Sequence, residues 1–321
     1  MKRSAGGVAN SSLNAPVSPF FIAISLATAL LTLGLIVFGA VVRVTESGLG
    51  CGNDWPLCNG TIFPPLDNIT AWIEWLHRLF ALLIGLFGLV MLALAWRRYR
   101  DQDRRVLNMT VLAALLFLVQ SGLGAVVVFL DLPPTFVTLH LGVAMLLLGA
   151  LLGATMLAWY QPRRPYQADT ATSLAGINAA FALLIILTGA LTRGSGATLA
   201  CTAWPLCSGA VLLPIDEGPL ALINMLHRLS VLAMALTMVL LQMQIERNRD
   251  ETLTKWIARA AGLAYLAQIG VGAMFVISAA GGEWGALHVG LAATVWGLLV
   301  ALVLIERINH QSYVSAEMRP A

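Results

Sequence analysis

The sequence predicts an all-α integral membrane protein whose eight transmembrane helices form two tandem, pseudo-symmetric four-helix bundles. Three observations support this fold class: charged residues make up only 11% of the 321 residues, long uncharged stretches recur, and the second half repeats motifs of the first. A soluble domain carries about 25% charged residues. The composition therefore excludes a water-soluble enzyme, a disordered chain and a nucleic-acid-binding protein.

Each predicted span is an apolar run long enough to cross a bilayer. A helix rises about 1.5 Å per residue, so roughly 20 residues cross a hydrocarbon core of about 30 Å. The strands of a membrane barrel would be shorter and would alternate apolar with polar residues. The predicted spans are 20–42, 71–96, 107–130, 136–160, 172–192, 220–245, 257–279 and 284–305.

The positions of Lys and Arg predict the orientation of the spans. Of the 19 Lys and Arg residues, 15 lie before the first span, after the last, in the connections that follow each even-numbered span or, for Arg259, in the first turn after such a connection. The positive-inside rule assigns these segments to the cytoplasm. The first 18 residues also lack the pattern of a cleaved signal peptide. We therefore expect a multi-pass protein of a bacterial plasma membrane, with both termini cytoplasmic.

Motifs of the first half return about 150 residues later in the same order, as expected for an internal repeat. The matched pairs are Gly39–Arg43 with Gly189–Arg193, Trp55–Cys58 with Trp204–Cys207, Leu76–Arg78 with Leu226–Arg228, and Gln120–Ala125 with Gln268–Ala273. Four spans are an even number, so both halves enter the membrane from the same side and the repeat is parallel. We expect an N-terminal bundle at residues 1–165 and a C-terminal bundle at residues 166–321.

Four of the five histidines lie near the outer ends of the even-numbered spans. They are His77, His140, His227 and His288. Ionisable residues within a span are costly and suggest a function. Two imidazoles from separate helices suit a six-coordinate haem iron, whereas zinc prefers three or four converging ligands. The pattern favours one haem in each bundle; another metal, or histidines that only bond neighbouring helices, are the alternatives.

Four arginines lie at the outer ends of the spans, where the propionates of such haems would emerge. They are Arg43, Arg78, Arg193 and Arg228. Guanidinium groups suit carboxylates, but these side chains could equally extend to the membrane interface. The Gln-x-Gly-x-Gly motifs at Gln120 and Gln268 would let a backbone approach a ring, or would serve plain helix packing.

The four cysteines form two pairs in outer loops, Cys51 with Cys58 and Cys201 with Cys207. An oxidising compartment favours a disulfide within each loop. Such a disulfide could be a structural staple near the haem site, or it could take part in redox chemistry or haem handling.

Together these motifs resemble those of the haem A synthase family, over about residues 20–305. The resemblance rests on Gly39-Ala-Val-Val-Arg-Val-Thr-Glu-Ser-Gly48, Cys51-Gly-Asn-Asp-Trp-Pro-Leu-Cys-Asn-Gly60, Glu74-Trp-Leu-His-Arg78 and the pattern of four histidines and four cysteines. It implies an iron-dependent oxidoreductase that converts the C8 methyl of haem O to a formyl group by successive hydroxylations. The product, haem A, would serve terminal oxidases.

The resemblance also assigns roles to the matched residues. It implies a resident haem b with His227 and His288 as axial ligands, and substrate haem O at His77 and His140. Glu74 corresponds to the family's catalytic glutamate. The expected partners are haem O, a haem O synthase that delivers it, an electron donor and the lipid bilayer, and the protein could form a homo-oligomer.

The two halves differ in chemistry at one matched position, where Glu74 corresponds to Asn224. Only the carboxylate can take a proton, so we hypothesise that Glu74 handles protons at the reacting haem; a plain ion pair with Arg78 is the alternative. A dihaem electron-transfer cytochrome would have two equivalent sites, which this difference disfavours. A haem carrier or exporter would often show an inverted repeat with broken helices.

Overall fold

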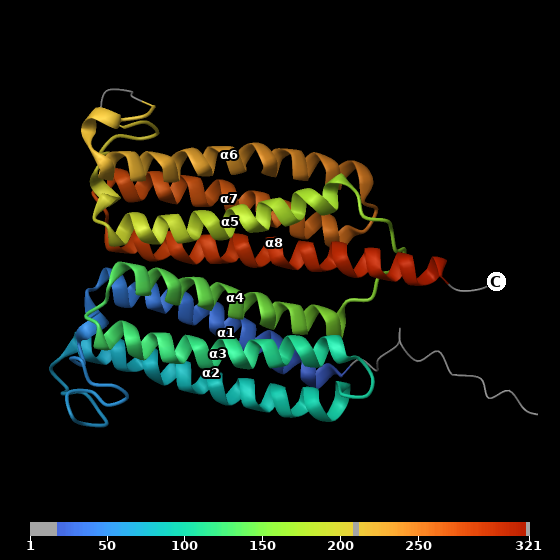
Figure 1. The fold of residues 1–321 in the computed structure, drawn as a ribbon, viewed down its shortest axis with the longest axis horizontal. Helices are drawn as coiled ribbons and strands as arrows, with labels where there is room; N and C mark the ends of the chain where they lie inside the picture. Colours follow the sequence, from blue (N-terminus) through green and yellow to red (C-terminus); the bar gives the residue numbers. More distant parts are fainter. Residues whose placement is uncertain (1–17, 208–211, 319–321) are drawn as a thin grey trace, which may run out of the picture.

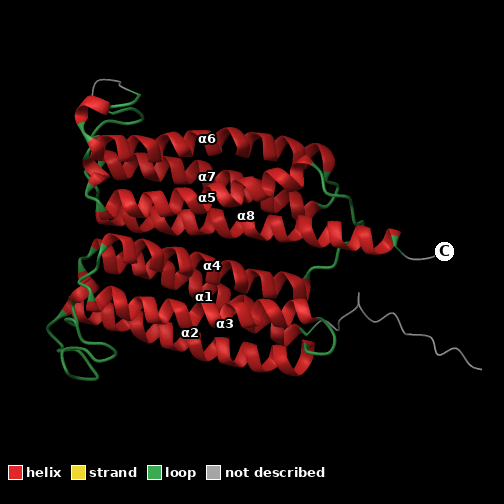
Figure 2. Ribbon diagram, viewed as in Figure 1, coloured by secondary structure: helices red, strands yellow, loops and turns green. Residues whose placement is uncertain are grey.

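The computed structural model describes residues 18–207 and 212–318, and it confirms the predicted fold class. It contains eight helices that are each long and apolar enough to cross a membrane, and no strand within the described residues (Figure 2). The helices are α1 (Pro19–Val44), α2 (Ile69–Tyr99), α3 (Arg104–Phe129), α4 (Pro134–Trp159), α5 (Thr170–Gly194), α6 (Pro219–Asn248), α7 (Thr252–Ile277) and α8 (Gly282–Glu317).

The helices extend beyond the predicted spans, because polar capping residues determine several of their ends. Asn68 caps α2 by accepting a hydrogen bond from the N–H of Ala71. Asp169 forms a capping box with Thr172 at the start of α5. Helix α8 differs most from the prediction, since it continues to Glu317 where the apolar run ends at residue 305. Glu306 and Asn309, just beyond that run, are buried.

In Figure 1, α1–α4 lie together in one layer and α5–α8 in another, as expected for two tandem bundles. Helices α1 and α4 of the first half pack against α5 and α8 of the second. Small residues allow close approach at this interface: a Cβ atom on Gly149 of α4 would lie 2.8 Å from the indole ring of Trp296 on α8. The two halves therefore share an apolar core.

Both cysteine loops lie at the same end of the helices, opposite the α2–α3 and α6–α7 connections (Figure 1). Disulfide bonds join Cys51 to Cys58 and Cys201 to Cys207. The N-terminal segment used in the orientation argument, with Lys2 and Arg3, lies outside the described residues. The remaining even-to-odd connections, with their arginines, lie at the end away from the disulfides.

A buried ion cluster joins three segments at that end. The Arg249 guanidinium donates to both carboxylate oxygens of Asp169, at 2.7 and 2.9 Å, and to both of Glu306, at 2.6 and 2.8 Å. The Glu306 carboxylate also accepts from the hydroxyls of Tyr166 and Thr172, each at 2.7 Å. The cluster therefore ties the segment between α4 and α5 to α8 and to the end of α6.

Candidate functional site

One large cavity lies among the helices, nearer the disulfide end. Its volume is about 1650 Å³, its lining is mostly apolar, and residues of all eight helices contribute to it. Typical ligand pockets have volumes of about 300–1,000 Å³, so this space exceeds the needs of a single small ligand. The lining includes every residue that the sequence singled out for haem chemistry: the four span histidines, the four outer arginines and Glu74.

Each histidine of the N-terminal half rests against a glycine on the preceding helix. A Cβ atom on Gly39 of α1 would lie 3.2 Å from Cε1 of His77 on α2. A Cβ atom on Gly124 of α3 would lie 3.3 Å from Cε1 of His140 on α4. A side chain at either glycine would push the imidazole ring slightly away from the helix that carries the glycine.

The C-terminal half repeats this arrangement with tighter spacing. The corresponding distances are 3.0 Å from Gly189 to Cε1 of His227 and 3.0 Å from Gly272 to Cε1 of His288. The glycines of the Gln-x-Gly-x-Gly motifs were interpreted as letting a backbone approach a ring. In this structure the second glycine of each motif accommodates an imidazole ring.

The glutamines of the same motifs contact the histidines directly. The amide nitrogen of Gln120 lies 3.0 Å from Nε2 of His140, and that of Gln268 lies 3.1 Å from Nδ1 of His288. The hydroxyl of Thr188 lies 3.4 Å from Nδ1 of His227. The sequence interpretation did not predict these partners, although the repeat of Gln120 as Gln268 was the signal that could have revealed them.

Several polar atoms at the histidine pairs are buried without a hydrogen-bond partner. Within the described part of the chain there are five such side-chain atoms, and four belong to these pairs: His77 Nδ1, His140 Nδ1, Gln120 Oε1 and Gln268 Oε1. An unpaired buried polar group costs about 1–3 kcal/mol. No three His, Cys, Asp or Glu side chains converge as a metal site in residues 18–207 and 212–318. The chain thus presents two pairs of imidazoles on facing helices, which is the donor set that suits haem.

Two of the four arginines are bonded to the cysteine loops. Arg78 forms an ion pair with Glu74 and donates to the backbone carbonyls of Asp54, at 2.8 Å, and Leu57, at 2.7 Å. Arg228 donates in the same way to the carbonyls of Cys201, at 2.9 Å, and Ala203, at 2.6 Å. These guanidinium groups therefore hold each loop against the even-numbered helix that carries the first histidine.

The other two arginines have no side-chain hydrogen bond or ion pair among the residues that the structure describes. Arg43 ends α1 and Arg193 ends α5, so they correspond to each other in the repeat. Both line the large cavity and an adjoining pocket of about 240 Å³, which Glu46 and Leu132 also line. The Glu46 carboxylate offsets one of the two positive charges, so this pocket keeps a net positive charge that favours an anionic ligand.

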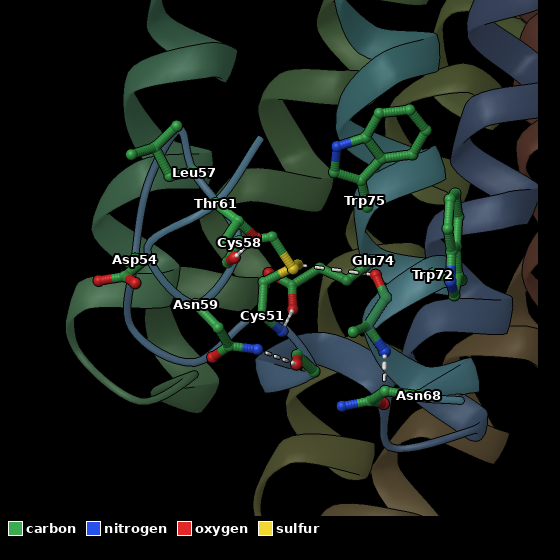
Figure 3. The surroundings of a disulfide bond; sticks show 12 residues. Cys51, Asp54, Leu57, Cys58, Asn59, Thr61, Asn68, Trp72, Glu74 and Trp75 are labelled. Carbon is green, nitrogen blue, oxygen red and sulfur yellow. Dashed lines mark hydrogen bonds between the residues drawn. A yellow bond between two sulfur atoms is a disulfide. The ribbon is translucent and has the colours of Figure 1, made fainter. Parts of the chain in front are cut away.

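Glu74 is buried, with 4% of its surface exposed, and links the cavity to the first disulfide loop. Its Oε2 accepts a hydrogen bond of 2.9 Å from the N–H of Cys51, next to the disulfide (Figure 3). Its other oxygen pairs with Arg78, as the structural alternative predicted. The Cys51 amide and the Arg78 guanidinium both donate to the carboxylate, so each of its oxygens serves as a hydrogen-bond acceptor.

Asn224 takes the corresponding place in the C-terminal half with the opposite hydrogen-bond polarity. Its amide nitrogen donates to the carbonyls of Ala197, at 2.7 Å, and Thr198, at 3.0 Å. Both residues hold the loop that precedes their helix. Among the described residues, however, only the N-terminal half places a carboxylate at the cavity wall.

Comparison with known proteins agrees with the resemblance. The family model of the COX15-CtaA cytochrome oxidase assembly proteins matches residues 23–300. A heme A synthase of Symbiobacterium thermophilum is 33% identical over 289 residues, which cover 86% of this chain and 92% of the relative. Heme A synthases of Geobacillus kaustophilus and Geobacillus thermodenitrificans are 30% and 28% identical, covering 90% and 87% of this chain and 92% and 89% of the relatives. The chain therefore belongs to the haem A synthase family of cytochrome oxidase assembly proteins.

Proposed function

We propose that this protein is a haem A synthase that oxidises the C8 methyl group of haem O to a formyl group. The observation that carries the proposal is the pair of imidazoles on facing helices in each half, all four lining one apolar cavity. The family membership and the names of the relatives support the same activity. An unactivated methyl C–H bond requires an oxidant that side chains cannot supply, and haem iron supplies it when bound.

In this proposal the two histidine pairs hold different haems. His227 and His288 would hold a resident haem b, and His77 and His140 would hold the substrate haem O. The glycine contacts support haem binding at both pairs alike, because they hold each imidazole at the cavity wall; the assignment of the two haems follows the family resemblance. In the N-terminal pair, Gln120 has to release Nε2 of His140 if that nitrogen is to bind iron.

The arginines divide into two roles in the same scheme. Arg43 and Arg193 bind haem propionates, since their guanidinium groups line the cavity and form no other polar contact in the described residues. Arg78 and Arg228 keep the disulfide loops in place and add positive charge near the cavity. Both disulfides then act mainly as staples of these loops.

Glu74 is proposed as the proton acceptor of the N-terminal site. The loss of water that gives the formyl group requires proton transfer near the reacting group. Among the described residues that line the cavity, Glu74 carries the only carboxylate, a group that can take up a proton. The Asn224 amide cannot take up a proton, which supports a role for the C-terminal haem in electron transfer and not in substrate oxidation.

The orientation in the membrane is inferred from the distribution of Lys and Arg, and the partners are inferred from the proposed reaction. The positive-inside distribution supports cytoplasmic termini and extracytoplasmic disulfide loops in a plasma membrane. A haem O synthase would supply a substrate too apolar to diffuse through water. Each hydroxylation would need an external oxidant and, where that oxidant is dioxygen, an electron donor that reduces the second oxygen atom to water.

The test is the haem content of cells that contain a haem O synthase and no other haem A synthase. Expression of this protein should convert haem O to haem A, measured by chromatography of extracted haems. The His77→Ala/His140→Ala variant should retain the haem b spectrum but form no haem A, whereas His227→Ala/His288→Ala should lose the low-spin haem b spectrum. A wild-type protein that carries two permanent haem b groups and leaves haem O unchanged would instead be a dihaem cytochrome.

A further inference from the structure

The first cysteine loop exposes large apolar side chains where it joins α2. Leu66 is 92% exposed, and Ile69, the first residue of α2, is 70% exposed. Neither side chain lines the large cavity. In Figure 1 this loop, drawn in blue, lies on the flank of the molecule away from α5–α8. An exposed apolar patch of this kind marks an interaction surface.

Two indole groups hold the loop along the start of α2. Trp72 Nε1 donates to the carbonyl of Pro65 at 3.0 Å, and Trp75 Nε1 donates to the carbonyl of Ile62 at 2.8 Å. The ring of Phe63 also packs on Trp75, with centroids 5.4 Å apart. This part of the loop therefore runs beside the first two turns of α2, antiparallel to the helix.

The spacing of tryptophans on α2 places the same part of the loop at the membrane boundary. Trp75 and the exposed Trp96 lie about 31 Å apart along the helix, which matches a hydrocarbon core of about 30 Å. Tryptophan is enriched at both membrane–water interfaces. Two exposed arginines, Arg97 and Arg98, follow Trp96, as expected at the lipid headgroups. Trp75 then marks the boundary at the disulfide end, and the loop bonded to it lies at the level of the headgroups.

Ile69 begins an apolar stripe that faces outward along α2. The stripe consists of Ile69, Ile73, Leu76, Phe80, Leu83 and Phe87, which recur every three or four residues as one helix face requires. Phe80, Leu83 and Phe87 are exposed, and no member of the stripe lines the cavity. Lipid covers this face where α2 spans the membrane, so lipid is also the neighbour of its outer end.

The second cysteine loop lacks these features at the matched positions. The pairs are Leu66 with Asp216, Ile69 with Pro219, Trp72 with Leu222 and Trp75 with Met225. Leucine and methionine side chains have no hydrogen-bond donor, so neither indole contact can recur. Ile215 is exposed in this loop too, but Asp216 and Glu217 place two adjacent, exposed carboxylates beside it, where the first loop has only Asp67. Burial of a charged carboxylate is costly, which favours water around the second loop.

We propose that Leu66 and Ile69 insert into the phospholipid surface at the disulfide end, whereas the tip of the second loop stays in water. The partner is the boundary between headgroups and acyl chains, which apolar side chains of peripheral segments enter by about 5–10 Å. The intervening Asp67 and Asn68 are polar, which suits a shallow position at the headgroups. The first loop then anchors the start of α2 in the membrane surface, independently of any haem chemistry.

The experiment measures the surroundings of each loop in full-length protein reconstituted into vesicles of phosphatidylcholine and phosphatidylglycerol. All four native cysteines are in disulfides, so a single new cysteine can be spin-labelled without a reducing agent. Leu66→Cys places the nitroxide in the first loop, and Asp216→Cys is the matched control in the second. Power saturation compares collisions with oxygen, which concentrates in lipid, and with a nickel chelate, which stays in water.

The ratio of oxygen to nickel collisions should be at least about threefold higher at residue 66 than at residue 216, as expected for a side chain at the acyl boundary. Equal ratios at the two positions would place both loops in water and overturn the proposal. A label at residue 66 that is shielded from both reagents would also overturn it, because a second copy of the chain would then cover the patch.

A second reporter tests whether Leu66 itself holds the loop in the lipid. The label is placed at Ile69→Cys, and Leu66→Asp introduces the residue type of the second loop. Because Leu66 is almost fully exposed, this change removes no internal packing, and thermal unfolding in detergent should match that of the parent protein. The collision ratio should fall by at least about twofold in the Asp variant, because the carboxylate opposes insertion. Leu66→Met should keep the parent ratio; an unchanged ratio in Leu66→Asp would show that Leu66 does not anchor the loop.

Discussion

The position of a Cβ atom on Gly272 lies 3.0 Å from Cε1 of His288, so the imidazole rests directly on the backbone of α7. The same relationship recurs at the other three span histidines, with distances of 3.0 to 3.3 Å. A group that must bind iron at a fixed angle benefits from such a rigid support. The histidine orientation therefore depends on glycines of the neighbouring helices as well as on the helix that carries each histidine.

Gly272→Ala should disturb the resident haem, because the added methyl group has to displace the His288 ring. We expect a shifted or reduced low-spin absorption spectrum and less haem b per protein. Gly270→Ala is the control, since Gly270 lies two residues earlier on α7 and a Cβ atom there meets no described atom within 4 Å. That variant should keep the wild-type spectrum; identical spectra for both variants would show that the glycine contact does not orient the ligand.

Arg43→Gln and Arg193→Gln should weaken haem retention in the N-terminal and C-terminal bundle, respectively. A hydrogen bond to a charged group contributes about 1.5–3 kcal/mol, so each loss should lower affinity roughly ten- to a hundredfold. The ratio of haem to protein after purification and an absorption titration measure the effect. Lys at the same positions should restore part of the affinity. Unchanged haem content in both Gln variants would exclude these arginines as propionate partners.

The sequence reveals the fold far better than the site. Unbroken apolar runs and the repeat predict the eight helices, because the bilayer imposes length and composition on each span. The apolar runs and the repeat do not show that Arg78 and Arg43 have different roles, since both arginines lie at the outer end of a helix. The difference arises from the folded loop, which places the carbonyls of Asp54 and Leu57 beside Arg78 only.

The ion cluster around Arg249 was equally inaccessible to sequence reasoning, because its members come from three separate segments. Arg249 is 3% exposed and Glu306 is fully buried. Arg249→Met leaves the Glu306 carboxylate buried without its counter-charge, so we expect a loss of about 3–5 kcal/mol of stability. Thermal unfolding in detergent measures it. Arg259→Met, which removes only an exposed ion pair with Glu246, should change the unfolding temperature little.

The same cluster predicts a pH dependence of stability. The Arg249 guanidinium holds the pKa of Asp169 below its ordinary value, chiefly through hydrogen bonds to the carboxylate. A carboxyl group with a lowered folded-state pKa stabilises the fold above its unfolded pKa, near 3.9, and loses that contribution as the pH falls through the folded value. The stability of wild type over Asp169→Asn should therefore be constant from pH 7 to about pH 5 and should shrink below about pH 4. A difference that grows on acidification would contradict this coupling.

Glu74→Gln tests the one chemical difference between the two histidine sites. Gln keeps the shape and its side-chain oxygen can still accept from the Cys51 amide, so the first loop should stay in place. The ion pair with Arg78 is lost, but Arg78 retains the carbonyls of Asp54 and Leu57. We therefore expect normal expression, an intact Cys51–Cys58 disulfide and an unchanged resident haem spectrum.

Conversion should nevertheless fall by about 10²–10⁴-fold, the usual contribution of a positioned proton-transfer group, because an amide cannot take up a proton from the reacting group. Haem O or a hydroxylated intermediate should accumulate in the extracted haems. The Arg78→Gln variant distinguishes proton transfer by Glu74 from anchoring of the loop. It keeps the Glu74 carboxylate but removes the guanidinium that binds the carbonyls of Asp54 and Leu57. If Glu74 acts only through the loop, any loss of activity in Glu74→Gln should be accompanied by altered loop proteolysis, as in Arg78→Gln. A Glu74→Gln protein that forms haem A at the wild-type rate would restrict Glu74 to the structural role that its contacts with Cys51 and Arg78 already define.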